Sequence, residues 1–180
     1  MHSQGYTLIE LLVVIVIMSI IGVVGFINYK HFVTSQITTN AITQIQSILR
    51  LAQSNATSSV LCNDNPPNPN VSPWSLSFNP GSITLSCGPS NSPWKTYNLE
   101  NATIDSIIGT SSSCGNASVP FPFKISFDNF GSLTFSTPGS LTYSATCLQS
   151  ASWVFTIRNA NDNSPPKNFS ISKGGAVDVQ

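Results

Sequence analysis

The sequence predicts an α+β protein, with a long N-terminal helix packed on an antiparallel, β-rich C-terminal domain. Three features of the 180-residue chain support this: a uniformly apolar beginning, apolar residues at helical spacing after it, and short alternating segments separated by turn clusters. The expected parts are a leader at 1–5, an apolar helix at 6–27, an amphipathic continuation at 28–57 and a β-rich domain at 58–180.

The apolar helix reads YTLIELLVVIVIMSIIGVVGFI from 6 to 27 and carries a single charge, Glu10. It is long enough to cross a hydrocarbon core of roughly 30 Å, so we expect a membrane span. A secretory signal cleaved on the far side would need small residues after it, but the first alanine is Ala41. An ionised group at the centre of a span costs on the order of 3 kcal/mol, so Glu10 needs a shallow position or a partner.

Gly5 to Gly22 read GYTLIELLVVIVIMSIIG, which resembles the processing site and first helix of type IV prepilins. The resemblance implies that prepilin peptidase cuts after Gly5 and methylates the new N-terminus on Tyr6. Glu10 then occupies the position of the family's glutamate, fifth in the mature chain. A cut there leaves an amine at a helix N-terminus, and Glu10 of one subunit can pair with the amine of its neighbour.

The chain departs from the prepilin pattern in two ways. Its leader MHSQG lacks Lys and Arg, so only the terminal amine and His2 favour keeping the leader inside the cell. No proline stands near Ile27, where many major pilins have one, and an unbroken helix suits a pseudopilin or minor pilin better. An uncleaved signal anchor is the alternative to a processed prepilin.

Two kinds of apolar spacing follow the membrane span. Helical spacing continues the helix to about Ala56 through Ile37, Ile42, Ile45, Ile48, Leu49 and Ala52. Period-two alternation predicts strands at 58–62, 74–78, 82–87, 123–128, 132–136, 152–158 and 168–172. Their expected core residues are Phe123, Ile125, Phe127, Trp153, Phe155 and Ile157. The proline-rich segment 63–70 reads as an exposed loop.

Three further segments are similar to GspH/FimT-type minor pilins. They are RLAQSNATSSVLC at 50–62, KISFDNFGSLTF at 124–135 and ISKGGAVDV at 171–179. In that subfamily they correspond to a helix leading into a cysteine-bearing strand, a strand-turn-strand unit and a final strand. The resemblance therefore implies a minor pilin or pseudopilin.

Cysteine usage points to disulfides. Cys62, Cys87, Cys114 and Cys147 all follow the apolar helix and form no CxxC pair of a zinc or redox site. An even count in a translocated domain suggests two bonds, and four cysteines allow three pairings. We expect Cys62 with Cys87 and Cys114 with Cys147, the pairing that closes the shortest loops overall, with free buried thiols as the alternative.

The sequence gives no reason to expect an enzyme, a metal site or a cofactor. The only histidines, His2 and His31, lie outside the β-rich domain, and no catalytic or nucleotide-binding motif is found. The acidic residues are scattered rather than paired. Tryptophans could form a carbohydrate platform, but core or loop-anchoring roles are favoured for all three, Trp74, Trp94 and Trp153.

Charge argues against nucleic acid as a partner. The net charge is zero and only 8% of the residues are charged. Non-specific DNA affinity comes from several clustered bases, whereas the tail at 175–179 is neutral and acidic. A DNA-binding face would require four bases to converge: Lys124, Arg158, Lys167 and Lys173.

The prepilin resemblance implies a structural subunit of a type IV pilus-like or type II secretion filament. It implies a single-pass precursor in the bacterial inner membrane with its globular domain outside the cytoplasm, and then a pilus or periplasmic pseudopilus. The implied partners are other pilin subunits, prepilin peptidase, the inner-membrane assembly platform and, before assembly, membrane lipid. The alternatives are a major pilin and a membrane-tethered module that binds DNA or carbohydrate.

Overall fold

The computed structural model describes residues 7–58, 74–88, 92–110, 118–128, 132–137, 152–162 and 164–179, except for the side chains of 24–28, 30, 31 and 92. The chain divides into two compact units, Met1–Gln36 and Ile37–Gln180, and each is described by itself. Helix α1, Leu8–Thr57, is continuous across their boundary. The unbroken helix to about Ala56 is therefore confirmed.

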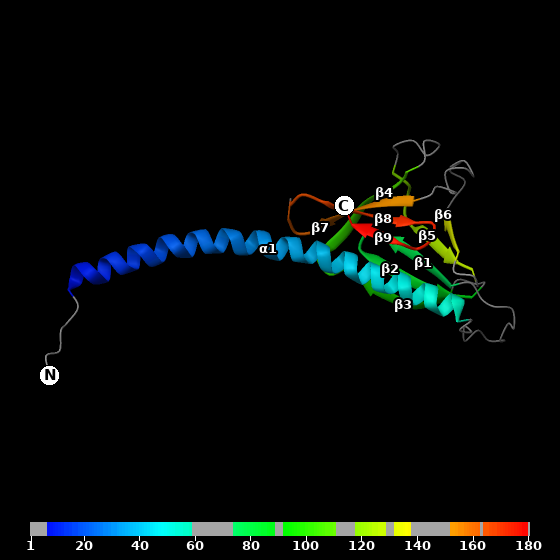
Figure 1. Ribbon diagram of the computed structural model, residues 1–180, viewed down its shortest axis with the longest axis horizontal. Helices are drawn as coiled ribbons and strands as arrows, with labels where there is room; N and C mark the ends of the chain where they lie inside the picture. The colour runs from blue at the N-terminus through cyan, green and yellow to red at the C-terminus, as the bar shows by residue number, and fades with distance from the viewer. Residues whose placement is uncertain are drawn as a thin grey trace. The chain divides into compact units, whose positions relative to one another are not determined.

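Among the described residues of the second unit, nine strands form two antiparallel sheets (Figure 1). The five-stranded sheet has the order β3-β2-β1-β5-β6 and the four-stranded sheet the order β4-β7-β8-β9. Their bounds are β1 Trp74–Asn79, β2 Ser82–Cys87, β3 Ser92–Asn98, β4 Ala102–Gly109, β5 Phe123–Phe127, β6 Leu133–Ser136, β7 Ser152–Asn159, β8 Lys167–Ser172 and β9 Val177–Val179. The α+β prediction is thus confirmed.

Period-two alternation located six of these strands. In the β1–β2 hairpin, Leu76 pairs with Leu85 and Phe78 with Ile83, and all four side chains are buried. Strands β5 to β8 also lie where alternation placed them, and the short β9 fits the final strand that the tail resembles. These strands could be read from sequence because each has one buried face and one that is more exposed.

Alternation did not reveal strands β3 and β4. Strand β3 lies at a sheet edge with most of its side chains exposed, so its sequence has no apolar alternation, and Pro93 is compatible with that edge position. In β4 the register shifts between Ile104 and Ser106, so Asp105 is an extra residue. This β-bulge interrupts the period on which the prediction depends.

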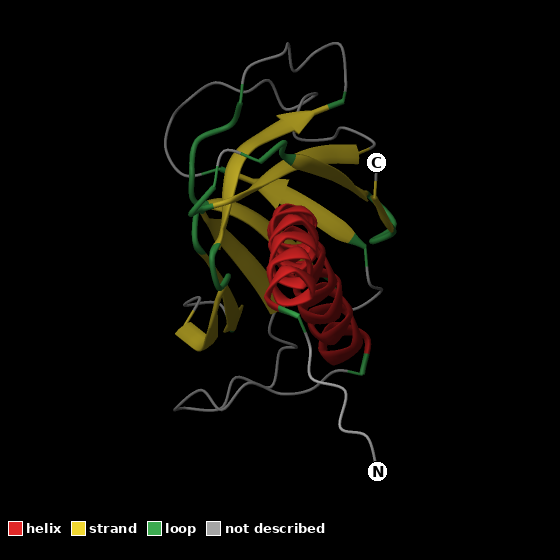
Figure 2. Ribbon diagram, turned by 90° about the vertical axis from the view of Figure 1, so that its left-hand side faces the viewer, coloured by secondary structure: helices red, strands yellow, loops and turns green. Residues whose placement is uncertain are grey.

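The core of the second unit lies between its sheets and its helical segment, Ile37–Thr57 (Figure 2). Aromatic contacts join the sheets: the ring centroids of Phe78 and Phe155 lie 5.2 Å apart, and those of Phe123 and Trp153 lie 4.8 Å apart. The expected aromatic and aliphatic core of β5 and β7 is confirmed. From the helix, the buried side chains are Ala41, Ile42, Ile45, Ile48, Leu49, Ala52 and Ala56, with Ile37 half-buried.

Several predictions fall outside the described residues. They concern the leader with Gly5 and Tyr6, most of the strand predicted at 58–62, the loop at 63–70, and the side chains of His2 and His31. Cys62, Cys114 and Cys147 also lie there. Cys87 is described: it is buried and disulfide-bonded, and its partner is one of those three cysteines. The proposed pairing stays a prediction.

Candidate assembly site

The first site candidate is the apolar surface of α1 between Leu8 and Val23. Every side chain in this stretch is exposed, and the exposed fractions of its large apolar residues run from 49% at Val13 to 83% at Leu8. The apolar residues are distributed all round the helix. A contiguous apolar surface of this kind requires lipid or other protein around it.

A capping box begins this helix. The main-chain N–H and the Oγ1 hydroxyl of Thr7 donate to Oε2 of Glu10, at 3.1 and 3.0 Å. The Glu10 N–H in turn donates to Thr7 Oγ1 at 3.4 Å. The two side chains thus bond reciprocally to main-chain N–H groups at the start of the helix, and the Glu10 N–H also donates to the Thr7 main-chain oxygen at 3.1 Å.

The capping box gives Glu10 a partner within its own chain. Its sequence signal is a Thr followed three residues later by Glu, before an apolar run. The sequence interpretation missed it because it assigned Glu10 only to a neighbouring subunit. Both Thr7 bonds reach Oε2. The other carboxylate oxygen, Oε1, accepts no hydrogen bond from the residues that the structure describes.

Among the described parts of the chain, no helical stretch combines the length and the hydropathy that a membrane crossing needs.

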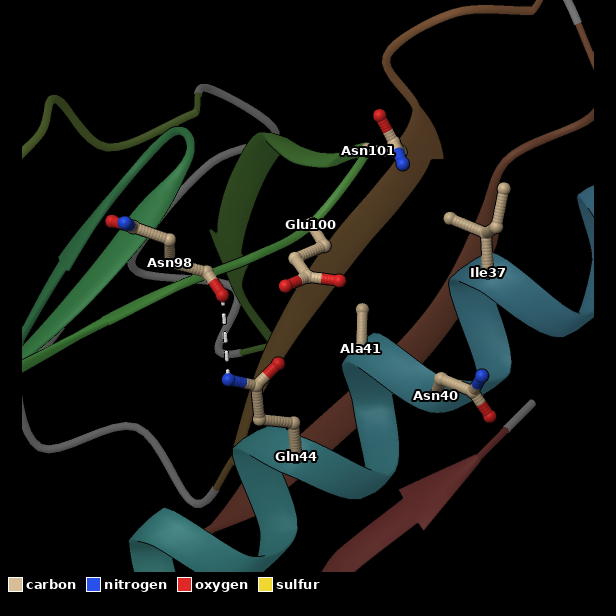
Figure 3. Close-up of a pocket in the computed structure, with 7 residues that line it drawn as sticks. All are labelled: Ile37, Asn40, Ala41, Gln44, Asn98, Glu100 and Asn101. Carbon is tan, nitrogen blue, oxygen red and sulfur yellow. Dashed lines mark hydrogen bonds between the residues drawn. The ribbon is translucent and has the colours of Figure 1, made fainter.

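A polar hollow of about 280 Å³ lies between α1 and the β3–β4 turn, within the second unit (Figure 3). The helix contributes Ile37, Ala41 and Gln44, and the turn contributes Asn98 and Glu100. Gln44 donates through Nε2 to the main-chain oxygen of Asn98 at 3.3 Å, which ties the helix to the turn. No sequence pattern predicts this hollow, because Gln44 and Asn98 on its two walls are 54 residues apart in the chain.

A second, more open hollow of about 500 Å³ lies over β4 and the end of β7. Arg158 forms an ion pair there with Asp105, the extra residue of the β4 bulge. Asn161 at its edge donates through Nδ2 to Oδ1 of Asn101 at 2.8 Å. Asn101 has a positive φ of 56°, a conformation that Asn tolerates better than most residues.

The four bases that could have formed a DNA-binding face do not form one cluster. Lys167 donates to Thr39 Oγ1 at 2.8 Å, and Arg158 is paired with Asp105. Lys124 lies on β5 in the other sheet, where desolvation by burial lowers its pKa.

The tryptophans do not form a shared platform. Trp74 and Trp153 are buried, as the core interpretation expected, whereas Trp94 on edge strand β3 is 58% exposed. The Trp94 ring stands edge-on to that of Trp74, with centroids 5.6 Å apart. A carbohydrate platform built from all three tryptophans would need three exposed rings, and only Trp94 is exposed.

The described residues contain no group of three or more His, Cys, Asp or Glu side chains that could hold a metal ion. One of their acids, Asp128, accepts through Oδ1 from the Ser132 N–H at 2.7 Å.

Comparison with known proteins identifies the N-terminal segment. Residues 1–26 match the family described as the prokaryotic N-terminal methylation motif. The chain carries this motif. The resemblance to prepilins over Gly5 to Gly22 is therefore confirmed at the level of the motif, whereas the roles expected for Gly5, Tyr6 and Glu10 stay predictions.

Two crystal structures of the type IV minor pilin FimU from Pseudomonas aeruginosa, in different crystal forms, are similar to this chain. One is 13% identical, covers 83% of this chain and 92% of its own, and has a TM-score of 0.48. The other is 14% identical, covers 79% and 91%, and has a TM-score of 0.45. No curated protein matched the sequence.

Proposed function

We propose that this chain is a structural, non-enzymatic subunit of a type IV pilus-like or type II secretion filament, acting as a minor pilin or pseudopilin. The observation that carries the proposal is the N-terminal methylation motif over residues 1–26, which continues into an apolar helical surface exposed on every side. Nothing among the described residues covers this surface, and identical helices bundled together would cover it. The absence of a helix-breaking proline favours a minor pilin or pseudopilin over a major pilin.

Before assembly, the same apolar surface would hold the chain in the bacterial inner membrane. The proposed span is 6–27, a single pass, with 28–57 continuing as helix and 58–180 outside the cytoplasm. The support is the apolar sequence of 6–27, with Glu10 as its one charge near the end where a shallow position is available. The partners in this scheme are lipid, prepilin peptidase, the assembly platform and other pilin subunits.

The capping box refines the role proposed for Glu10. Thr7 holds Oε2, and this fixes the carboxylate at the first turn of the helix. Oε1 is then the oxygen for the Tyr6 amine of a neighbouring subunit after cleavage. One carboxylate would thus cap its own helix and neutralise the neighbour's amine, which removes two buried charges as the helices bundle.

Leader removal is the direct test of processing. Gly5→Val should leave the five-residue leader attached in cells that hold prepilin peptidase, whereas Gly22→Val should be processed. Gly22 is a matched control because it lies in α1, away from the expected cut, and a side chain there meets nothing within 4 Å. Mass spectrometry of the N-terminal peptide reads both outcomes. Normal maturation of the Gly5→Val chain would refute cleavage after Gly5.

Assembly is tested at Glu10. Glu10→Gln keeps the shape of the side chain and removes the charge, so the protein should insert into the membrane and lose its leader but enter filaments poorly. Thr7→Ser retains a hydroxyl at the cap and should assemble normally. The measurement is the fraction of the subunit in sheared filaments relative to membranes. Undiminished incorporation of Glu10→Gln would remove the pairing role.

Stoichiometry distinguishes the remaining alternatives. A major pilin would dominate purified filaments, a minor pilin would be a trace component, and a tethered binding module would be absent from them. Quantitative mass spectrometry of purified surface filaments, compared with periplasmic assemblies of the secretion type, separates these cases. We expect a trace component.

A further inference from the structure

Helix α1 carries an exposed aromatic face just beyond the proposed membrane span. Tyr29 is 64% exposed, Phe32 is 60% exposed and Val33 is 38% exposed. Residues three and four apart in a helix are neighbours on its surface, so these three side chains lie on one side of α1. We call Tyr29, Phe32 and Val33 the aromatic face.

The aromatic face lies at a boundary in the sequence. Between Tyr6 and Tyr29 the chain has one charged residue, Glu10, and its first Lys or Arg is Lys30. Residues 34–40 read TSQITTN, in which only Ile37 is apolar. The aromatic face therefore stands where the apolar stretch ends and a polar stretch of the same helix begins.

The length of helix before this face matches the apolar core of a bilayer. At 1.5 Å per residue, α1 is about 32 Å long from Leu8 to Tyr29. The hydrocarbon core of a typical bilayer is roughly 30 Å thick. When the capping box of Thr7 and Glu10 lies at one membrane surface, Tyr29 therefore lies at the other.

The side chains themselves suit the boundary between lipid headgroups and acyl chains. Tyrosine is enriched there because its ring is apolar and its hydroxyl can remain in contact with water. In an α-helix each Cα–Cβ bond tilts toward the N-terminus. Phe32 and Val33 are therefore directed back along the helix toward the apolar stretch, where acyl chains would surround them.

We propose that the aromatic face contacts the lipid headgroup boundary on the side of the inner membrane away from the cytoplasm, and that it sets the depth of the precursor in the bilayer. The inference rests on the proposed function, because the span at 6–27 is what brings this face to the membrane surface. It adds the residues that fix the position of that span along the membrane normal.

The test measures the depth of added tryptophans in the full-length chain, held in vesicles of phosphatidylethanolamine and phosphatidylglycerol. Bromine atoms on the lipid acyl chains quench a tryptophan that lies close to them. Tyr29→Trp should lose more fluorescence to bromines near the headgroups than to bromines near the bilayer centre, and Ile17→Trp should show the reverse order. Leu51→Trp, at a partly exposed position in the second unit, should lose no more than the wild-type protein with its three native tryptophans.

A second comparison tests whether the two rings set the depth. In the Ile17→Trp chain, adding Tyr29→Ser and Phe32→Ser replaces both rings with groups that favour water. The helix should then move outward, and the strongest quenching of the tryptophan at position 17 should shift toward the headgroup bromines. Exchanging the rings with Tyr29→Phe and Phe32→Tyr keeps two aromatic groups and should leave the order of quenching unchanged.

Two results would overturn the proposal while Ile17→Trp is still quenched by the deep bromines. One is a Tyr29→Trp chain that is quenched mainly by the deep bromines or by none. The other is an unchanged depth at position 17 when both rings are replaced by serine. If Ile17→Trp is not quenched at all, the chain does not enter the bilayer, so the proposed membrane precursor fails and this inference fails with it.

Discussion

The two halves of helix α1 share one backbone geometry but differ in where their apolar side chains go. Between Leu8 and Val23 every side chain is exposed, whereas the Ile37–Thr57 segment buries Ala41, Ile45, Ala52 and their neighbours against the sheets. The first stretch is apolar all round, and the second is apolar on one face. Apolar composition alone therefore does not bury a helix. A helix face is buried only where other residues of the chain pack against it.

This contrast separates what each half contributes. The one-sided second half has a complete partner in its own chain and stabilises the β-rich domain. In the first half every described side chain from Leu8 to Val23 is exposed, and we assign its apolar residues to lipid or to neighbouring subunits. Substitutions in the two halves should therefore affect different measurements.

The largest expected effect is on the stability of the domain. Ile45→Ala removes a fully buried side chain, and such truncations cost about 2–5 kcal/mol through lost burial and the cavity left behind. Ile15→Ala truncates the same residue type where it is exposed and should leave the domain's free energy of unfolding unchanged. Urea unfolding of the detergent-solubilised full chain measures both, because all three tryptophans report from the domain.

If Ile15→Ala and Ile45→Ala lowered the domain's free energy of unfolding equally, the contrast would be wrong. Both halves of the helix would then stabilise the domain. The opposite result is expected in filaments. There Ile15→Ala should reduce incorporation, since it removes part of the surface that we assign to subunit packing.

An effect of similar size per bond is expected from the predicted disulfides, since all four cysteines follow the apolar half of α1. Non-reducing peptide mapping should find Cys62 joined to Cys87 and Cys114 joined to Cys147. Each bond closes a loop of roughly 25 to 35 residues, so reduction should lower the domain's stability by about 3 to 4 kcal/mol per bond on the chain-entropy model. Crossed linkages would refute the pairing without affecting the filament proposal.

The sequence predicted a helix or strand correctly where one face of the segment is buried and the other is exposed in a regular period. It failed where that period is missing. Helical spacing identified the buried face at Ile45 and Ala52, and alternation identified β1, β2 and β5 to β8. Strand β3 is exposed and β4 carries a bulge, so neither presents a regular period.

The site residues were predictable only where they are close in sequence. Glu10 could be assigned from its motif, and Thr7 could have been, since the capping box spans four residues. The hollow lined by Gln44 and Glu100 could not be predicted, because these residues are far apart in sequence and only the folded chain brings them together. No local sequence pattern indicates such a long-range contact.

The smallest expected effect concerns the Asp105–Arg158 ion pair. Each region thus has one carboxylate with a side-chain partner in its own chain, Glu10 with Thr7 in the apolar half and Asp105 with Arg158 in the domain. The Asp105 side chain is 26% exposed and that of Arg158 is 49% exposed, so water competes for both charges. A double-mutant cycle with Asp105→Asn and Arg158→Gln should give a coupling free energy of about 0.2–1 kcal/mol, as is usual for exposed pairs. The coupling should nearly vanish in about 1 M salt, where the screening length falls to roughly 3 Å.

A coupling above about 2 kcal/mol, or one insensitive to salt, would instead mean that the β4 bulge shields this pair from solvent. The β-bulge would then be a stabilising feature of the domain rather than an irregularity that its core tolerates.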